Sequence, residues 1–594
     1  MKSYARKTAW GAAIATVMAA GAAGFGSMSA QTATRPAAGV SMIKESDMRE
    51  FLTYLSSDQL LGREVFTEGY GVASQYVADQ LKGWGIKPGG DSGSYFQMVK
   101  FNDVKTVSDG SSITVEVAGQ TRIFKNGEGV KFKTPVGGKQ TITLNGAEFL
   151  GYALNAPQKD DYAGKSVKGK AVVWVGLPPP DAASYGNRLI GGRAAHAVEE
   201  AWAAASISYD PAAVAPPAAA TAAPVAGGGA GPAAPASQGR GARMLGNIRI
   251  AAPTQGDIQT VQDLSLKRAP QITGGDEFFE FLLSAAPTKF SAIKELATAH
   301  KDLPSFAISG VKLTINADAT YQVLQTLYTR NVVGVIEGSD PQLKSTYVMF
   351  GAHLDHVGYR PAAAAGGGRG GRAGAAADAA PAGPPDLIFN GADDDGSGTT
   401  GELGIAKAFA TGPKPKRSVI FIWHAGEEAG LLGSKYNADF PVVPLDKVVA
   451  QLNIDMIGRD RNNDAKYSNT VFVIGADRIS TDLHNVVVET DAKLASPVTL
   501  DYEYNDPTDA NGFYFRSDHY SYAAKGVPIA FFFTGTHPDY HQASDSVEKI
   551  HFDKLTHIAQ LVYQAGMTLA NSDKAPVRDN KGPRAGKGFQ GTIK

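Results

Sequence analysis

The chain has 594 residues, which is too many for one hydrophobic core, so about two or three domains are expected. Hydrophobic residues make up 43% and charged residues 19%, the composition of an ordinary soluble globular protein. A formal net charge of −1, with no basic patch outside the C-terminal tail, argues against nucleic acid as a partner. The chain has no cysteine, which excludes disulfides, cysteine nucleophiles and cysteine-ligated zinc.

The N-terminal segment has the pattern of a secretory signal. Basic residues precede an apolar, alanine-rich run from Thr8 to about Phe25, and a small-x-small ending follows at Ser27–Ala30. The pattern predicts a signal peptide over residues 1–30 and an exported protein, periplasmic or extracellular. An uncleaved membrane anchor is the alternative, but the run is short and rich in Gly and Ala for a span of about 20 apolar residues. We therefore expect no stable membrane anchor after cleavage.

The next part of the chain is predicted to be helical and then β-rich. Apolar residues recur at helical spacing around Phe51–Leu55 and Ala73–Leu81. The pattern then changes to short alternating runs, which predicts a β-rich domain over residues 111–318. We expect this domain to be inserted into another, formed by residues 42–110 and 319–571.

Three segments have too few large apolar residues to form a core. Residues 211–242 and 361–385 are almost wholly Ala, Pro and Gly, and residues 572–594 are polar and basic. We expect the first two to be disordered surface loops and the third to be a disordered tail.

From about Asn331 onward, β-branched and aromatic runs alternate with helical stretches. Strands are predicted at residues 331–336, 346–350, 418–423, 449–454 and 527–533, and helices at residues 400–410 and 483–494. This alternation predicts an α/β fold, with a mixed but mostly parallel sheet covered by helices on both faces. In such sheets ligands bind at the carboxyl ends of the strands.

Histidine and acidic residues form five blocks at or beyond the predicted strand ends. The blocks are GAHLDH at 351–356, NGADDDGSG at 390–398, HAGEE at 424–428, DMIG at 455–458 and HPDYHQ at 537–542. Alone, Asp393–Asp395 could be a helix N-cap and Glu427–Glu428 a charge pair at a helix N-terminus. The combination favours a bound cation, because carboxylates gathered at buried strand ends repel one another and lose hydration.

The residue types suit zinc. Imidazole and carboxylate are the zinc ligands available to a chain without cysteine, and two zinc ions about 3.5–4 Å apart need a bridging carboxylate. His353 and Asp355 point the same way on an extended chain, which suits a histidine whose second nitrogen is held by a carboxylate. Glu427 and Glu428 are adjacent and cannot both point at one metal, so we expect one ligand and one general base.

Five segments around these blocks, residues 351–358, 390–398, 425–434, 453–458 and 540–545, resemble the co-catalytic zinc exopeptidases. That family includes bacterial leucyl aminopeptidases, aminopeptidase Y and relatives of glutamate carboxypeptidase II. Residues 55–63 and 88–97 are similar to the start of its catalytic domain. Residues 160–186 resemble the protease-associated domain that is often inserted there. The resemblance implies a zinc exopeptidase fold of the phosphorylase/hydrolase-like type and two zinc ions per chain.

The resemblance also implies a ligand set. His353 and Asp455 would hold one zinc, Glu428 and His541 would hold the other, and Asp394 would bridge the two. All five presumptive ligands are present, which weighs against an inactive, receptor-like relative.

Further roles follow from the same resemblance. Glu427 would be the general base and Asp355 would orient the first histidine ligand. Tyr540 and Arg516 match positions that hold the substrate carbonyl and nearby groups in some members. Asp393 is the neighbouring alternative to the bridging aspartate.

The implied activity is hydrolysis of the N-terminal peptide bond of peptides through a two-zinc-activated water. A carboxypeptidase-type member and a glutaminyl-cyclase-like transferase with one zinc remain as alternatives, whereas a serine hydrolase lacks its G-x-S-x-G motif. The sequence does not determine the preferred N-terminal residue, the physiological substrate or the oligomeric state. Nor does it fix the native metal, because similar ligands accept several divalent ions.

Overall fold

The structure is a computed structural model, and it describes residues 39–579 apart from 135, 157, 186, 215–256, 261–263, 265–266, 361–385, 507–508 and 510. The predicted signal peptide and the low-complexity segment 361–385 lie outside the described residues. So does most of the segment 211–242, whose first residues form a short helix, α4 (Pro211–Val214). Across the described ranges, no helix is both long enough and apolar enough to cross a lipid bilayer.

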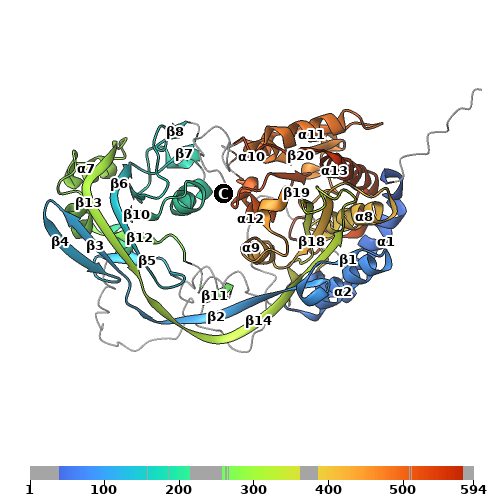
Figure 1. The fold of residues 1–594 in the computed structure, drawn as a ribbon, viewed down its shortest axis with the longest axis horizontal. Helices are drawn as coiled ribbons and strands as arrows, with labels where there is room; N and C mark the ends of the chain where they lie inside the picture. The colour runs from blue at the N-terminus through green and yellow to red at the C-terminus, as the bar shows by residue number, and fades with distance from the viewer. Residues whose placement is uncertain are drawn as a thin grey trace, which may run out of the picture. The chain divides into compact units, whose positions relative to one another are not determined.

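The main sheet is mixed, with parallel pairing at its centre and mostly antiparallel pairing outside it (Figure 1). Four neighbouring parallel strands form the centre: β18 (Ser418–His424), β15 (Tyr347–His353), β19 (Val448–Ile454) and β22 (Ile529–Phe533). The flanking strands are β14 (Ala319–Ile336), β2 (Phe96–Asp109), β11 (Asp257–Thr260) and β1 (Lys87–Pro88) on one side, and β20 (Thr470–Ile474) and β21 (Thr499–Asp501) on the other. The predicted α/β fold with a mixed sheet is confirmed.

Alternate residues of the central strands feed two separate cores, one on each face of the sheet. Phe421 and Trp423 of β18 belong to the core beneath α1 (Glu45–Leu55), α2 (Glu68–Gly83), α8 (Gly396–Thr411), α11 (Thr481–Asp491) and α13 (Phe552–Asn571). Ile420 and Ile422 of the same strand belong to the core beneath α9 (Leu432–Asp439), α10 (Ala476–Ile479) and α12 (His519–Ala523). Because both faces are covered, the strand ends are left as the place where polar groups can gather.

One strand is much longer than its predicted core. We expected a strand at residues 331–336, but β14 begins at Ala319 and pairs with β2 along its length, with two irregularities in register. The first half of β14 is mostly exposed or half-buried, so its sequence carries no continuous apolar run. The β2–β14 ribbon connects the main sheet with the segment that contains the second sheet.

The second sheet is formed by strands between residues 112 and 317. In spatial order they are β4 (Gln120–Lys125), β3 (Ser112–Val117), β13 (Ser305–Ala317), β6 (Gln140–Leu150), β9 (Ala171–Val175), β10 (Ala205–Tyr209), β12 (Gln271–Gly274) and β5 (Val130–Phe132). This sheet has its own buried core, to which α6 (Asp276–Leu282) and α7 (Phe290–Thr298) contribute. Its identity as a protease-associated domain stays a prediction.

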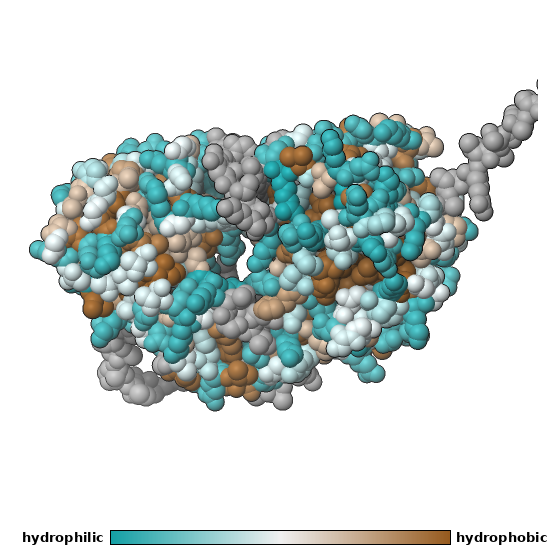
Figure 2. Space-filling model, viewed as in Figure 1, coloured by the Kyte–Doolittle hydropathy of each residue, from teal (hydrophilic) through white to brown (hydrophobic). Residues whose placement is uncertain are grey.

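The distribution of hydrophobic residues on the surface drawn in Figure 2 is typical of a protein in contact with water. Figure 2 shows hydrophobic and hydrophilic residues interspersed over the described part of the face drawn, as is usual for protein surfaces in contact with water.

The start of the expected disordered tail follows a defined course. Arg578 donates a hydrogen bond to the carbonyl of Val448 at 3.1 Å, and the main-chain N–H of Asp579 donates to the carbonyl of Ile479 at 3.1 Å. Residues 572–579 are therefore held against the main domain, in contrast to our expectation, because charged side chains near the chain end find main-chain partners there. Residues 580–594 lie outside the described residues.

Candidate metal centre

The predicted blocks converge at the carboxyl ends of the parallel strands. β15 ends at His353, while Glu427 and Asp455 follow shortly after the ends of β18 and β19. These three strands are adjacent and parallel, so their ends lie at one edge of the sheet. Asp394 lies in the loop that leads into α8 at the same edge.

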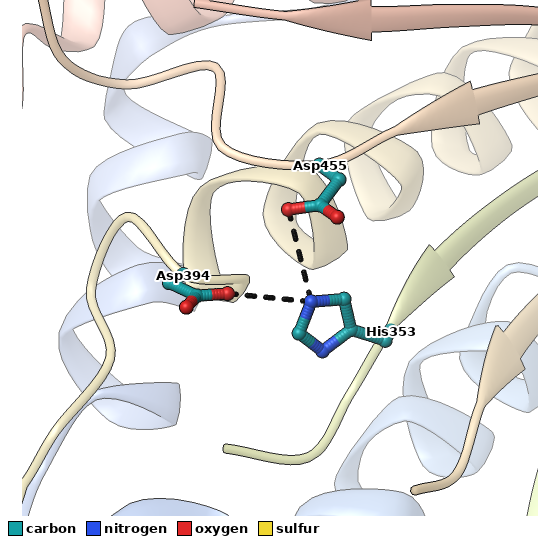
Figure 3. A group of neighbouring side chains, drawn as sticks. All are labelled: His353, Asp394 and Asp455. Atoms are coloured by element: carbon teal, nitrogen blue, oxygen red, sulfur yellow. Dashed lines mark ion pairs between the residues drawn. The ribbon is translucent and has the colours of Figure 1, made fainter. Parts of the chain in front are cut away.

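One cluster joins His353, Asp394 and Asp455. The Nε2 atom of His353 lies 3.3 Å from Oδ1 of Asp394 and 3.7 Å from Oδ1 of Asp455 (Figure 3). All three side chains are buried. Zinc ligands about 2.0–2.1 Å from a tetrahedral ion are about 3.3 Å apart, so this spacing suits three ligands of a single ion.

A second cluster uses the other carboxylate oxygen of Asp394. Its Oδ2 atom lies 3.0 Å from Nε2 of His541, and that same nitrogen lies 3.0 Å from Oε2 of Glu428. Asp394 thus presents one oxygen to each cluster. A carboxylate that bridges two metal ions has this arrangement.

The donor atoms fit divalent cations. Oδ2 of Asp394, Oε1 of Glu428 and Nε2 of His541 are buried, yet none forms a hydrogen bond of acceptable geometry with any described residue. Buried polar atoms without such a bond are uncommon, and an ion is one explanation for them. Burial raises the pKa of the Glu428 carboxyl, but the neighbouring His541 opposes this, and the pKa is lowered to about 2.

The structure separates Asp394 from Asp393. The carboxylate of Asp393 accepts a hydrogen bond from the main-chain N–H of Gly458 at 2.7 Å, and its other oxygen lies 3.1 Å from Nε2 of His537. Asp393 therefore holds neighbouring loops together instead of facing the cluster. This observation supports the predicted position of the bridge.

Asp395 has a third role. Its carboxylate accepts hydrogen bonds from the main-chain N–H groups of His353, Met456 and Gly398, at 3.1, 3.0 and 2.9 Å. The bond from Gly398 makes Asp395 the N-cap of α8, so the helix-cap interpretation holds for this residue. The other two bonds fix the main chain at two of the predicted ligand loops.

Asp355 holds a different group from the one we expected. Its carboxylate lies 3.9 Å from Nδ1 of His353, whereas its main-chain carbonyl lies 3.0 Å from that nitrogen. The carboxylate instead accepts the main-chain N–H groups of Glu427 at 3.1 Å and Glu428 at 3.4 Å. The predicted orienting contact therefore comes from the main chain of Asp355, because its carboxylate is engaged by the next loop.

Glu427 lies beside the first cluster. Its Oε2 atom is 4.0 Å from Nε2 of His353, and its side chain is only 12% exposed. Burial raises the pKa of Glu427 well above its ordinary range; His353 opposes this rise, and the nearby carboxylates of Glu428 and Asp455 add to it. A carboxylate with a raised pKa in this position suits a proton acceptor and donor.

Tyr540 and Arg516 both line a small pocket at the centre. Arg516 donates a hydrogen bond to the hydroxyl of Tyr540 at 3.2 Å, and the Tyr540 ring stacks on His541 with ring centroids 4.0 Å apart. The three side chains of the first cluster line the same pocket, and so do four apolar residues, Met456, Phe513, Phe531 and Phe533. The two predicted substrate-binding residues thus lie where a substrate would meet the metal centre.

Sequence reasoning missed three residues at this centre. His356 lies 2.9 Å, through Nδ1, from Oε1 of Glu428, and its place three residues after His353 was the available signal. Asp545 accepts the main-chain N–H groups of Asp393 and Asp394 at 3.0 and 3.1 Å. The third residue is Arg63. It lies in the segment 55–63 that is similar to the start of the family's catalytic domain, but nothing in the sequence indicated that it would be buried.

Two clusters of histidine and carboxylate that share one aspartate thus lie at the carboxyl edge of the parallel strands, and their side chains could hold metal ions. Residues 331–566 match the model of Peptidase family M28. The resemblance to co-catalytic zinc exopeptidases is thereby confirmed.

The relatives are aminopeptidases by name. A probable leucine aminopeptidase of Arthroderma otae is 30% identical over 240 residues, covering 39% of this chain and 56% of that protein. Leucine aminopeptidase 2 of Trichophyton equinum is 26% identical over 283 residues, covering 47% of each chain. The chain thus spans about half the length of these relatives. An aminopeptidase from Aneurinibacillus sp. strain AM-1 has a similar structure, with a TM-score of 0.41, 17% identity and coverage of 91% of this chain and 97% of that one.

Proposed function

We propose that this protein is an exported two-zinc aminopeptidase that removes the N-terminal residue from peptides. One observation carries the proposal: Asp394 presents its two oxygens to two histidine–carboxylate clusters, and Glu427 lies beside them at the pocket. The match of residues 331–566 to the model of Peptidase family M28 supports it.

The chemistry divides between the metals and the chain. Zinc, when bound by the two clusters, supplies a Lewis acid and lowers the pKa of a bound water. Glu427 accepts the proton of the attacking water at its carboxylate and then passes it to the leaving amine. Tyr540, positioned by Arg516, donates a hydrogen bond to the carbonyl oxygen of the scissile bond as negative charge develops there.

The pocket favours a substrate with a free amino terminus. A carboxypeptidase needs a cation for the substrate's terminal carboxylate, but Arg516 is the only arginine or lysine among the described residues that line this pocket, and it contacts Tyr540. Carboxylates of Glu427 and Asp455 line the same pocket and suit a positively charged amine. The aromatic wall formed by Phe513, Phe531 and Phe533 suits an apolar first side chain.

The Glu427→Gln substitution tests the assignment of the general base. We expect kcat to fall by about 10²–10⁴-fold, because the amide cannot accept the proton. Elemental analysis should still find two zinc ions per chain, and Glu489→Gln, at a side chain that is 69% exposed, should leave kcat unchanged. Normal turnover by the zinc-loaded variant would refute the role.

Blocked peptides distinguish the classes of enzyme. An aminopeptidase cleaves C-terminally amidated peptides and aminoacyl-p-nitroanilides but not N-acetylated peptides. The reverse pattern would identify a carboxypeptidase. A single zinc with cyclisation of N-terminal glutamine would identify a glutaminyl-cyclase-like transferase.

Export has its own test. Sequencing the N-terminus of the mature protein from the periplasm or medium should show cleavage near Ala30. An intact chain that stays with the membrane fraction would contradict the proposed export.

A further inference from the structure

We propose that His356 is a fourth protein ligand of the second metal position, beside His541, Glu428 and Asp394. The inference rests on the two-zinc site proposed above. It makes the two positions unequal, because the first has only His353, Asp455 and the shared aspartate.

The ring of His356 is fixed in place. Its side chain is fully buried, and its main-chain N–H donates to the carbonyl of Arg63 at 3.3 Å. Gly391 packs against the ring so closely that a Cβ atom there would come within 2.5 Å of it. The imidazole therefore cannot turn away from the cluster without movement of the main chain.

The ring faces the ligand atoms of the second position. Its Nδ1 atom lies 2.9 Å from Oε1 of Glu428 and 3.8 Å from Oδ2 of Asp394. These three side chains each offer an atom within 4.8 Å of the others. Such distances suit ligands arranged around a common ion.

The short contact to Glu428 is not a hydrogen bond. Neither ring nitrogen of His356, nor Oε1 of Glu428, forms a bond of acceptable geometry with any described residue. At 2.9 Å the distance is right for a hydrogen bond but the direction is wrong. Two potential ligand atoms that lie this close without a well-directed hydrogen bond between them could both bind one metal ion.

Other buried histidines of the same domain differ. His537 bonds Asp393 at 3.1 Å, and His424 bonds the hydroxyl of Tyr522 at 2.8 Å and the carbonyl of Ala352 at 3.2 Å. His537 and His424 thus each have at least one ring nitrogen in a polar contact, whereas neither ring nitrogen of His356 forms a hydrogen bond of acceptable geometry with a described residue.

The extra ligand predicts an order of metal binding. Four protein ligands close a tetrahedral zinc site, whereas three leave a position open for water or substrate. The second position should therefore bind zinc more tightly and fill first. The first position, next to Glu427, keeps the open site.

The test is a zinc titration of the metal-free full-length protein, followed by calorimetry or a competing chelator. We expect two zinc ions of unequal affinity in the natural chain. His356→Ala should weaken the tighter site by about 100-fold or more, since even outer partners of ligands are worth about 10–100-fold. His541→Ala serves as the matched ligand control and should also weaken that site. The metal-free variants are compared with the natural chain by circular dichroism to confirm folding.

Two further measurements decide the role of His356. X-ray absorption should show three imidazoles per two zinc ions in the natural chain and two in His356→Ala. His356→Gln, which keeps hydrogen bonding, should bind zinc as weakly as His356→Ala. Natural affinity in either variant, or an unchanged imidazole count in His356→Ala, would overturn the inference while leaving the two-zinc proposal intact. Failure of the natural chain to bind two zinc ions would instead refute the proposed function.

Discussion

Arg63 is a buried side chain whose removal should strongly destabilise the protein. It is 1% exposed, and its guanidinium donates only to main-chain carbonyls. The acceptors are Leu55 at 2.6 Å, Asn390 at 2.7 Å, and Leu354 and Gly391 at 2.9 Å each. One side chain thus joins the N-terminal helix to two loops that carry predicted zinc ligands.

The size of the effect follows from these contacts. Arg63→Met keeps most of the volume but removes these four hydrogen bonds, although the carbonyl of Gly391 also accepts from the main-chain N–H of Gly396. A buried hydrogen bond to a charged group is worth about 1.5–3 kcal/mol. Such values do not add. Burial of the guanidinium is itself costly. It lowers the pKa of Arg63, although nearby carboxylates such as Asp395 raise that pKa in part. Breaking a buried charged network by removing one partner typically costs about 3–5 kcal/mol, and we expect that range here.

Urea unfolding of the zinc-loaded protein measures the effect. Arg49→Met is the matched control, because Arg49 is 57% exposed and pairs with Glu45 at the surface. It also lies 3.9 Å from the centroid of the Phe552 ring, so its loss should change stability by about 1 kcal/mol or less. Zinc should also dissociate faster from Arg63→Met, since both tethered loops carry ligands. A loss of stability below about 1 kcal/mol with unchanged zinc release would refute the reasoning.

Two further predictions concern metal and pH. Chelation should lower the melting temperature reversibly, because the carboxylates around Asp394 then face one another without a cation. Free zinc at about 1,000 times its Kd stabilises the folded state by about 4 kcal/mol. An unchanged melting temperature would contradict the metal site. Burial raises the pKa of Glu64 to about 7 from 4.5, so the folded state holds its proton where the unfolded state does not. Stability should therefore fall as pH rises from about 4.5 to 7, by at most on the order of 3 kcal/mol. Glu64→Gln should lose this part of the dependence of stability on pH. The same pH dependence in the variant would exclude Glu64 as its source.

The strand ends could be predicted because apolar runs are strong signals. The runs before His353 and Asp455 are buried on both faces, and the topology of a parallel sheet brings the residues after them together. The first half of β14 could not be found in this way, because a ribbon that is exposed on both sides needs no apolar run.

The division of roles among Asp393, Asp394 and Asp395 depends on donors from distant segments. The main-chain N–H of Gly458 engages the first and that of Met456 the third, and both donors are more than 60 residues away in sequence. No local pattern encodes those partners. The sequence could therefore place the triplet at the site but could not decide, from the residues alone, which carboxylate faces the metal.

The same contacts explain how the site can hold its shape before metal binds. Arg63 ties the loops after β15 and before α8 to the N-terminal segment, and Asp355 ties the loop after β15 to the loop after β18. Asp395 adds the loop after β19, and Asp545 fixes the main chain at the aspartate triplet. Each of these contacts is a hydrogen bond between a buried charged side chain and a main-chain group, so none of them requires the metal. The ligand loops are thereby preorganised, and zinc binding should mainly relieve repulsion between carboxylates rather than drive folding of the loops.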